Sequence, residues 1–411
     1  MQFNPLLLPP GCSRFEAYRE AMERSPVHQQ GIFPVWHILG YEECVRSLRE
    51  AENFSSSPLN SFLVAGAPDR REERIKRLVP VMGQTAEFVD NLMLMNDPPR
   101  HTRLRGLVTR AFSPTAIRKL QDRIQVMTDE LVDSILKKDT FDFVEDFAIP
   151  LPVHVVAEIL GVDIERRHDF KRWSDGFVSV PVQKIMSGDI GDENMEWRRE
   201  FTDYFLEIFA RRRREPGDDL VSQLVQLEQQ GEKLSADELL ATCVLLMVAG
   251  NETTTNLLSN TALALTQFPE EMDHIVRKPA AIPDAIEESL RYYAPIQGFP
   301  RYCIRKTELG DKTIRPGDMM MVWAGAANRD EAVFADPDRF DITRPPGKHL
   351  SFGMGIHHCL GATLARVEGQ IAFETFFRRV GPLRPVGDEP PQFLPSSFLF
   401  GLKTFRMSRA P

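Results

Sequence analysis

The stretch from Ser235 to about Gln267 constrains the fold most, because it has the pattern of one unusually long helix. It opens with the capping box Ser235-x-x-Glu238, in which each side chain accepts a free backbone N–H of the first turn. Helix-forming residues continue for about 30 positions, or roughly 48 Å at 1.5 Å per residue. Apolar residues on nearly every side from Leu239 to Ala249 indicate burial. A buried helix of this length has to cross a large helical body.

Other parts of the chain show which structure surrounds that helix. Apolar residues at spacings of three and four predict further helices in stretches such as Leu120 to Leu136 and Phe201 to Phe209. The C-terminal third differs, because Phe299 to Ile304 and Met319 to Trp323 have strand patterns, the second after a turn. No unstructured linker separates the helical and strand-rich parts. We predict a mainly α protein with a small β region (α+β), folded as a single domain over residues 1–411.

Composition limits the location and the partners. The 42% hydrophobic and 27% charged content are ordinary for a globular protein, and the net charge of −9 disfavours nucleic acid and anionic membranes as main partners. The apolar run Leu6-Leu7-Leu8 is too short for a signal sequence and far below the ~20 residues of a membrane span. We expect a soluble, cytoplasmic, monomeric protein without a membrane partner.

The five cysteines lie far apart in the sequence, which predicts neither a disulfide framework nor a CxxC metal site. Each is by default a small buried hydrophobe. Motifs of serine hydrolases, zinc proteases and P-loop proteins are missing from the sequence, and Gly353-x-Gly355 lacks the third glycine of a dinucleotide loop, since His358 stands there. The cysteines are Cys12, Cys44, Cys243, Cys303 and Cys359.

Cys359 has the surroundings that distinguish it from the other four. Glycines stand at 353, 355 and 361, and the helical pattern Ala362 to Arg366 follows directly. Glycines allow a backbone to approach a flat, bulky group closely. A cysteine just ahead of a helix lies where free N–H groups and the helix dipole favour the thiolate, the form that binds metals. The loop therefore suits a metal macrocycle.

This segment resembles the haem-binding signature FxxGxxxCxG of the cytochrome P450 family, matched at Phe352, Gly355, Cys359 and Gly361. The resemblance, which extends from about residue 15 onward, implies a triangular helical body with a long central helix distal to haem b. It makes Cys359 the iron ligand, with Phe352 packed near its sulfur. It also places Gly353 and Gly361 in the cofactor loop and a hydrogen bond from His357 to a haem propionate.

The long helix carries a second pattern. Its apolar character gives way at Gly250-Asn251-Glu252-Thr253-Thr254-Thr255, which a kink at Gly250 with threonine hydroxyls bonding to carbonyls one turn earlier could explain. The same residues from Ala249 to Thr253 match the family pattern [AG]Gx[DE]T, which lies over the haem. The resemblance implies that Ala249 and Gly250 contact the cofactor, that Thr253 holds the iron-bound oxygen by a hydrogen bond, and that Glu252 helps to relay protons.

Glu288 and Arg291 stand at i, i+3 in the helical run Asp284 to Tyr293. Taken alone, an exposed pair at this spacing is worth only about 0.2–0.5 kcal/mol. The resemblance changes the interpretation, because ExxR matches the family's buried structural pair, which an arginine from a PxRF segment completes. Here that arginine is Arg339. We assign these three residues to folding of the cofactor-binding core.

The remaining cofactor contacts also follow from the resemblance. After Asp97-Pro98-Pro99, His101 and Arg105 lie four residues apart on one predicted helix face. In the family an HxxxR pair reaches the haem propionates, together with an arginine of the strand after ExxR, here Arg301. Cationic and N–H donors match carboxylates. We therefore assign His101, Arg105, Arg301 and His357 to the propionates.

The predicted substrate pocket is apolar. Family topology places a set of uncharged positions near the distal face, although each could equally be an ordinary core position. Such a lining suits a lipophilic molecule such as a fatty acid, terpenoid or steroid. The set comprises Leu245, Val248, Ala249, Ile296, Phe299, Phe398 and Leu399.

The resemblance implies a monooxygenase that uses O2 and electrons from outside, because the chain has no flavin or iron–sulfur motif. We expect a ferredoxin or flavodoxin with an NAD(P)H-dependent reductase, docked by an acidic face on basic residues. Three alternatives stay open: a peroxide-driven peroxygenase, which often lacks the acid–alcohol pair, a non-catalytic haem sensor, and a helical protein without haem. The basic residues are Arg100, Arg103, Arg110, Arg118, Lys119, Lys348 and Arg366.

Overall fold

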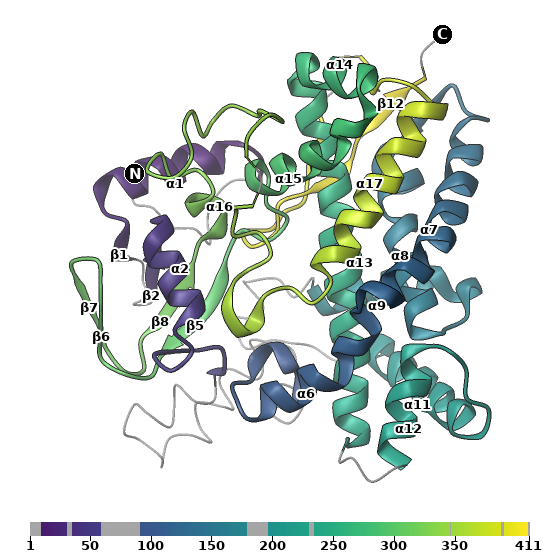
Figure 1. Ribbon diagram of the computed structural model, residues 1–411, viewed down its shortest axis with the longest axis horizontal. Coiled ribbons are helices and arrows are strands. Elements are labelled where there is room, and N and C mark those ends of the chain that lie inside the picture. Colours follow the sequence, from purple (N-terminus) through teal and green to yellow (C-terminus); the bar gives the residue numbers. More distant parts are fainter. Residues whose placement is uncertain are drawn as a thin grey trace. The chain divides into compact units, whose positions relative to one another are not determined.

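The computed structural model describes residues 10–30, 35–58, 91–178, 196–229, 234–345, 347–387 and 390–409 (Figure 1). The helices are α1 (Ser13–Arg24), α2 (Tyr41–Arg49), α6 (Arg100–Thr109), α7 (Pro114–Ile135), α8 (Pro150–Leu160), α9 (Arg167–Val178), α11 (Glu196–Arg214), α12 (Leu220–Gln229), α13 (Ala236–Gln267), α14 (Pro269–Arg277), α15 (Ile282–Tyr292), α16 (Ala324–Ala327) and α17 (Ala362–Arg379). The strands are β1 (Val27–Gln30), β2 (Val35–Ile38), β3 (Phe54–Ser55), β4 (Thr140–Asp142), β5 (Phe299–Cys303), β6 (Thr307–Leu309), β7 (Lys312–Ile314), β8 (Met319–Val322), β9 (Arg384–Pro385), β10 (Gln392–Phe393), β11 (Leu402–Thr404) and β12 (Arg406–Ser408). The predicted class, mainly helical with a small β region, is confirmed.

The chain forms two compact units, each built from segments that are distant in the sequence. Unit 1 comprises Met1–Ser55, Arg118–Leu151 and Thr253–Pro411, and unit 2 comprises Ser56–Ile117 and Pro152–Glu252. The assignment of the whole chain to one domain stays a prediction.

The main sheet of unit 1 joins the two ends of the sequence. Its strand order is β1-β2-β8-β5-β3, with β2 and β8 parallel and the other pairs antiparallel. Figure 1 shows the N-terminal strands beside the later green strands, with α2 alongside. A core of buried side chains including Ile38, Phe54 and Val322 holds these layers together. The N-terminal segment therefore completes the sheet that carries β5, the strand of the predicted residues Phe299 and Arg301.

Helices α15 and α17 pack closely in unit 1. A side chain at Gly369 of α17 would lie 3.0 Å from Ile286 Cδ1 of α15, so the glycine allows this approach. The chain immediately before α17 is the segment that holds Cys359. Packing of α17 on α15 thus fixes the start of the helix on which that cysteine depends.

Unit 2 has an aromatic core between α9 and α11. Trp173 is fully buried, and the rings of Phe201 and Phe205 have centroids 4.5 Å apart. The predicted helix of the Phe201 to Phe209 pattern is α11, which ends at Arg214. Such large aromatic side chains bury much apolar area per residue, which stabilises the packing of the two helices.

The long helix is confirmed as α13, which runs without interruption for 32 residues. Its capping box forms as predicted: the Ser235 N–H donates to Glu238 Oε2, and the Glu238 N–H donates to Ser235 Oγ, both at 3.1 Å. A Cβ at Gly250 would lie 2.6 Å from Val156 Cγ2 of α8. Gly250 therefore serves the close packing of two helices, and the helix is not interrupted there.

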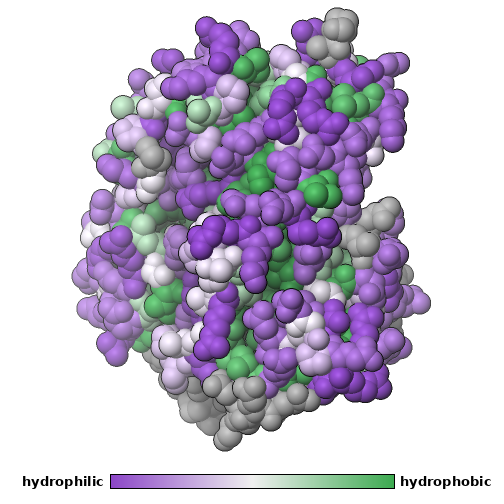
Figure 2. All heavy atoms as spheres, turned by 45° about the vertical axis from the view of Figure 1, so that its right-hand side comes forward, coloured by the Kyte–Doolittle hydropathy of each residue, from purple (hydrophilic) through white to green (hydrophobic). Residues whose placement is uncertain are grey.

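The molecular surface offers little apolar area on the face shown in Figure 2, where hydrophilic residues predominate and apolar residues form small separate patches. The large apolar side chains most exposed among the described residues are scattered along the chain. They are Leu94, Val126, Leu206, Val276 and Phe398. Within the described part of the chain, no helix is both long enough and apolar enough to cross a membrane.

Candidate functional site

The cysteine loop of unit 1 is a short, backbone-bonded turn. Gly353 and Gly355 adopt φ angles of 64° and 70°, a left-handed region that other residues rarely adopt. The Cys359 N–H donates to the Phe352 carbonyl at 2.8 Å, which closes the loop. A Cβ at Gly355 would lie 2.5 Å from the Leu48 carbonyl oxygen, so the loop also approaches the end of α2. These contacts fix Cys359 three residues before α17.

Cys359 differs from three of the other cysteines in its exposure. Cys44, Cys243 and Cys303 are buried, and burial raises the pKa of each thiol. Cys359 is only partly buried. A partly exposed thiol ahead of a helix N-terminus is where a thiolate ligand is favoured.

Cys12 shares that partial exposure and also precedes a helix, α1. Its sulfur lies 3.3 Å from the Tyr293 hydroxyl, which in turn is 2.7 Å from Gln267 Oε1. Cys12 is thus engaged in packing between α1 and the end of α15. Exposure alone therefore does not distinguish Cys359 from Cys12, and the role of Cys359 as the metal ligand stays a prediction.

An ion-pair network that sequence reasoning missed anchors the loop. Glu287 of α15 accepts bonds from Arg366 of α17, one of them at 3.0 Å, and lies 3.2 Å from His349 Nε2. Burial would raise the pKa of Glu287, but these two partners outweigh it and lower the pKa to about 2. The Arg366 guanidinium also lies 4.5 Å from the centre of the Phe352 ring. Arg366 therefore connects α15 to the signature phenylalanine.

The predicted pair Glu288 and Arg291 is buried, with 4% and 3% of the residues exposed. Arg291 donates two bonds to the carboxylate, at 2.7 and 2.8 Å, and others to main-chain carbonyls, including that of Arg339. Because both charges are hydrogen-bonded, removal of one partner would leave the other buried and uncompensated. This burial distinguishes the pair from the exposed pair that its spacing alone suggests.

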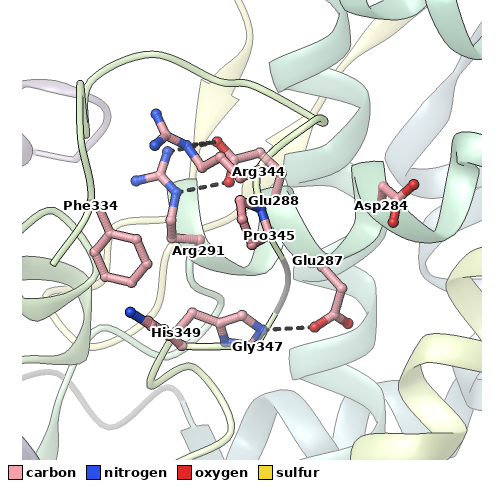
Figure 3. Close-up of a pocket in the computed structure, with 10 residues that line it drawn as sticks. Asp284, Glu287, Glu288, Arg291, Phe334, Arg344, Pro345, Gly347 and His349 are labelled. Carbon is pink, nitrogen blue, oxygen red and sulfur yellow. Dashed lines mark hydrogen bonds and ion pairs between the residues drawn. The ribbon is translucent and has the colours of Figure 1, made fainter.

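The assignment of Arg339 as the third member was wrong. Its side chain is exposed, and only its carbonyl joins the network. Arg344 occupies the predicted role, since its Nε donates to Glu288 Oε1 at 3.1 Å. Figure 3 shows Glu288 between Arg291 and Arg344. The turn after Phe340 carries Arg344 back over the pair, which no local sequence pattern reveals.

A surface pocket lies over this network (Figure 3). Its walls carry charged residues, including Asp284, Glu287 and Lys348, and His349 points toward Glu287. Most of the charges are already hydrogen-bonded to one another. The pocket is thus part of the structural network and does not suit a lipophilic substrate.

Four predicted substrate residues come together in unit 1. Ile296 and Leu399 form a bridge, and the Gln297 N–H donates to the Phe398 carbonyl at 2.8 Å. Phe299 of β5 borders the cysteine loop, because a Cβ at Gly353 would lie 3.8 Å from Phe299 Cζ. All four are apolar and at least partly exposed. Phe299 thus lies near the thiol-bearing loop, and the bridge joins Ile296 to Leu399.

The other three predicted substrate residues lie on α13 in unit 2. Leu245 and Val248 are half-buried and Ala249 is exposed, whereas Val244 and Met247 on the other faces are buried. Their spacing places them on one helix face. An apolar face that stays accessible in the middle of a mostly buried helix is consistent with a ligand-lining role.

Glu252 has partners that the sequence did not predict. Its Oε1 lies 3.2 Å from both Lys171 Nζ and Ser174 Oγ of α9, and the residue is 8% exposed. Burial would lower the pKa of Lys171, but Glu252 and Asp175 outweigh it and raise the pKa. Thr253, the next residue, is half-buried. The predicted acid is therefore held by an ion pair.

The predicted propionate partners lie in both units. His101 on α6 is 2% exposed, and burial together with Arg105 lowers the pKa of its imidazole. Arg301 on β5 is 7% exposed and donates to the Pro300 carbonyl. His357 is half-buried, one residue before the exposed His358. Their roles at the propionates stay predictions.

The basic docking surface is partly neutralised. Arg100 and Arg103 both bond to Glu238, and Arg366 pairs with Glu287. The exposed members of the predicted set are Arg103, Arg110, Arg118, Lys119 and Lys348.

Known proteins resemble this chain over nearly its whole length. The family model described as "Cytochrome P450" matches residues 163–277 and 281–408, which include Cys359 and exclude Cys12. A "Putative cytochrome P450 YjiB" of Bacillus subtilis is 36% identical over 96% of this chain and 93% of its own.

Two solved structures are also similar. CYP109E1 from Bacillus megaterium in complex with testosterone has a TM-score of 0.85 at 32% identity and covers 97% of this chain and 98% of its own. P450BioI in complex with acyl carrier protein ligated to hexadec-9Z-enoic acid has a TM-score of 0.82 at 32% identity and covers 96% and 98%.

Proposed function

This chain belongs to the cytochrome P450 family, and on that premise we propose that it hydroxylates an apolar C–H bond of a lipophilic small molecule with Cys359 as the iron ligand. The family makes it a monooxygenase, an oxidoreductase whose cofactor is haem b. The observation that carries the residue assignment is the partly exposed Cys359, held in a glycine loop three residues before α17.

The residues present fit haem. The loop offers the thiol of Cys359, which is only partly buried and forms no disulfide. Gly353 has a left-handed backbone conformation and adds no side chain to the loop surface. When bound, haem supplies the activation of O2, which consumes two electrons and two protons, and a thiolate ligand favours cleavage of the O–O bond. The free N–H groups at the start of α17 favour the ionised form of Cys359.

We propose that Glu252 and Thr253 manage protons. Positioned acids and bases typically contribute about 10²- to 10⁴-fold to such a step. Support comes from α9, whose side chains Lys171 and Ser174 hydrogen-bond the Glu252 carboxylate. Release of that carboxylate from Lys171 is then part of the proton path. The acid–alcohol pair is also the feature that favours O2 chemistry over a peroxide-driven reaction.

We propose a lipophilic substrate of the steroid or fatty-acid type. The support is the apolar character of the accessible residues Phe299, Phe398 and Leu399 in unit 1 and of the face of α13 in unit 2. The named ligands of two relatives, testosterone and hexadec-9Z-enoic acid, have the same character. Both are therefore suitable first probes.

We propose a ferredoxin or flavodoxin with its reductase as the electron donor. The proposed contacts for an acidic partner are Arg110 of unit 2 and Lys348 of unit 1, which are both exposed. Charge reversal of both should slow reduction and weaken its dependence on salt. Unchanged reduction rates would exclude this docking surface. The cytoplasmic location and the monomeric state stay predictions.

The decisive experiment compares Cys359→Ser with Cys12→Ser. The wild type and the Cys12 variant should give the red-shifted Soret band of a thiolate-ligated haem in the reduced, CO-bound state, whereas Cys359→Ser should lose it. A non-catalytic haem sensor would keep that band but form no product with a reductase system. Loss of the band in Cys12→Ser alone would refute the assignment of Cys359.

A further inference from the structure

Arg14 occupies a position that is unfavourable for an arginine. It lies in the first turn of α1, where the positive end of the helix dipole repels a cation, and only 1% of the residue is exposed. No carboxylate pairs with it among the described residues. A buried cation without a counter-charge is retained only where other strong hydrogen bonds compensate it.

Those hydrogen bonds go to one loop at the other end of the chain. Arg14 Nη2 donates to the Ser396 carbonyl at 2.7 Å, and Nη1 donates to the Leu399 carbonyl at 3.2 Å. The guanidinium also lies 5.3 Å from the centre of the Phe400 ring. A planar fork of donors can hold two carbonyls at a fixed separation, which a lysine cannot do.

The loop between these carbonyls carries two predicted substrate residues, Phe398 and Leu399. Other bonds fix its ends, since the Asn260 side chain donates to the Phe400 carbonyl and the Gln297 N–H to the Phe398 carbonyl. The Phe398 ring is stacked on Trp323 at an interplanar angle of 3°, yet 37% of the residue stays exposed. The loop thus presents an apolar ring whose position depends on carbonyls that Arg14 holds.

We infer that Arg14 is a positioning residue for the substrate pocket. From its place on α1, it sets the placement of Phe398 and Leu399. The inference rests on the proposed function, because it assumes that these two side chains contact the substrate. It assigns a selectivity role to the N-terminal helix, which the sequence patterns did not connect with the site.

The experiment uses the haem-loaded full chain and two nitrogen ligands of ferric haem. Imidazole binds the iron alone, whereas 4-phenylimidazole also places a phenyl ring against the apolar lining. The ratio of the two dissociation constants therefore measures the contact of the phenyl ring with the apolar lining, and the natural substrate need not be known. The variants are Arg14→Lys, which keeps the charge but loses the fork, and Arg14→Met, which loses both. Phe398→Ala is the reference, and Arg19→Met, an exposed arginine of the same helix, is the matched control.

We expect Arg14→Met to weaken 4-phenylimidazole binding by about tenfold while imidazole binding stays unchanged, with a smaller change for Arg14→Lys. Arg19→Met should match the wild type. If the methionine variant fails to bind haem, the lysine variant carries the test. If both Arg14 variants keep the wild-type ratio of dissociation constants while Phe398→Ala changes it, the inference about Arg14 is overturned and the pocket assignment stands. An unchanged ratio in Phe398→Ala would overturn the pocket assignment on which it rests.

Discussion

Lys171 Nζ lies 3.2 Å from Oε1 of Glu252, so the acid predicted to relay protons is one half of an ion pair. The side chain of Glu252 is 11% exposed, and that of Lys171 is 28% exposed. The ion pair and the bond from Ser174 fix the direction of the carboxylate toward α9. Any movement of Glu252 during turnover has to break this contact first.

Lys171→Met should destabilise the protein by about 1–3 kcal/mol, because it leaves the buried Glu252 carboxylate with the hydrogen bond from Ser174 but without its cation. Asp175→Asn is the matched control. Asp175 also pairs with Lys171, but its side chain is 49% exposed, so the loss should stay below about 1 kcal/mol. Urea unfolding of both variants measures the difference. Equal effects would show that the Glu252 contact contributes no more than a surface pair.

Gly250→Ala should destabilise the fold by about 1–3 kcal/mol, because the new Cβ would lie 2.6 Å from the stiff, branched Val156. Gly106→Ala offers the opposite case within α6. Outside its own helix backbone, no atom of the described residues lies within 4 Å of that Cβ, so the gain in helix propensity should stabilise the protein by roughly 0.5–1 kcal/mol. Thermal unfolding of both variants shows whether the two changes in stability have opposite signs. A stable Gly250→Ala variant would mean that α8 and α13 can move apart at little cost.

Arg344→Gln should reduce both stability and haem incorporation, because it removes a donor to the buried Glu288, with a cost of about 1–3 kcal/mol. Arg339→Gln should have little effect, since that side chain is exposed. The pair of variants tests which arginine completes the network, by haem content per chain and by chemical unfolding. The reverse order of effects would restore the assignment made from the sequence motif.

Glu368→Gln should change how stability depends on pH. Burial raises the pKa of Glu368 to about 8 from its ordinary 4.5. Between these values the unfolded carboxyl releases a proton that the folded one keeps, so the free energy of unfolding falls as pH rises. The wild type should therefore lose on the order of 3–5 kcal/mol from this group between pH 4.5 and 8, and the variant should lose less.

The control for that prediction is Glu374→Gln on the same helix, where the carboxylate accepts a bond from Gln370 at 2.8 Å and is partly exposed. Its stability profile should follow that of the wild type. Unfolding curves at several pH values provide the measurement. An unchanged slope in Glu368→Gln would mean that the buried carboxyl is ionised in the folded protein.

Local patterns determined much of the architecture. The capping box at Ser235, the length of α13 and the position of Cys359 before α17 were predictable, because they depend on neighbours within a few residues. Periodicity also predicted α7 and α11, and turn and strand patterns predicted β5 and β8. The signature around Cys359 is local as well, and it identifies the family from the sequence alone.

The tertiary structure decided which charges are paired and which apolar residues are accessible. Lys171 reaches Glu252 across 81 positions, and Arg14 reaches Leu399 across 385, separations over which no sequence period exists. Arg339 and Arg344 look alike in sequence, and only the path of the turn directs one of them to Glu288. The sequence by itself determined the helices and the glycine loop around Cys359, since these are local. The partners of Glu252, Glu288 and Phe398 depend on long-range packing, because hydrogen bonds and burial are set by which elements fold against one another.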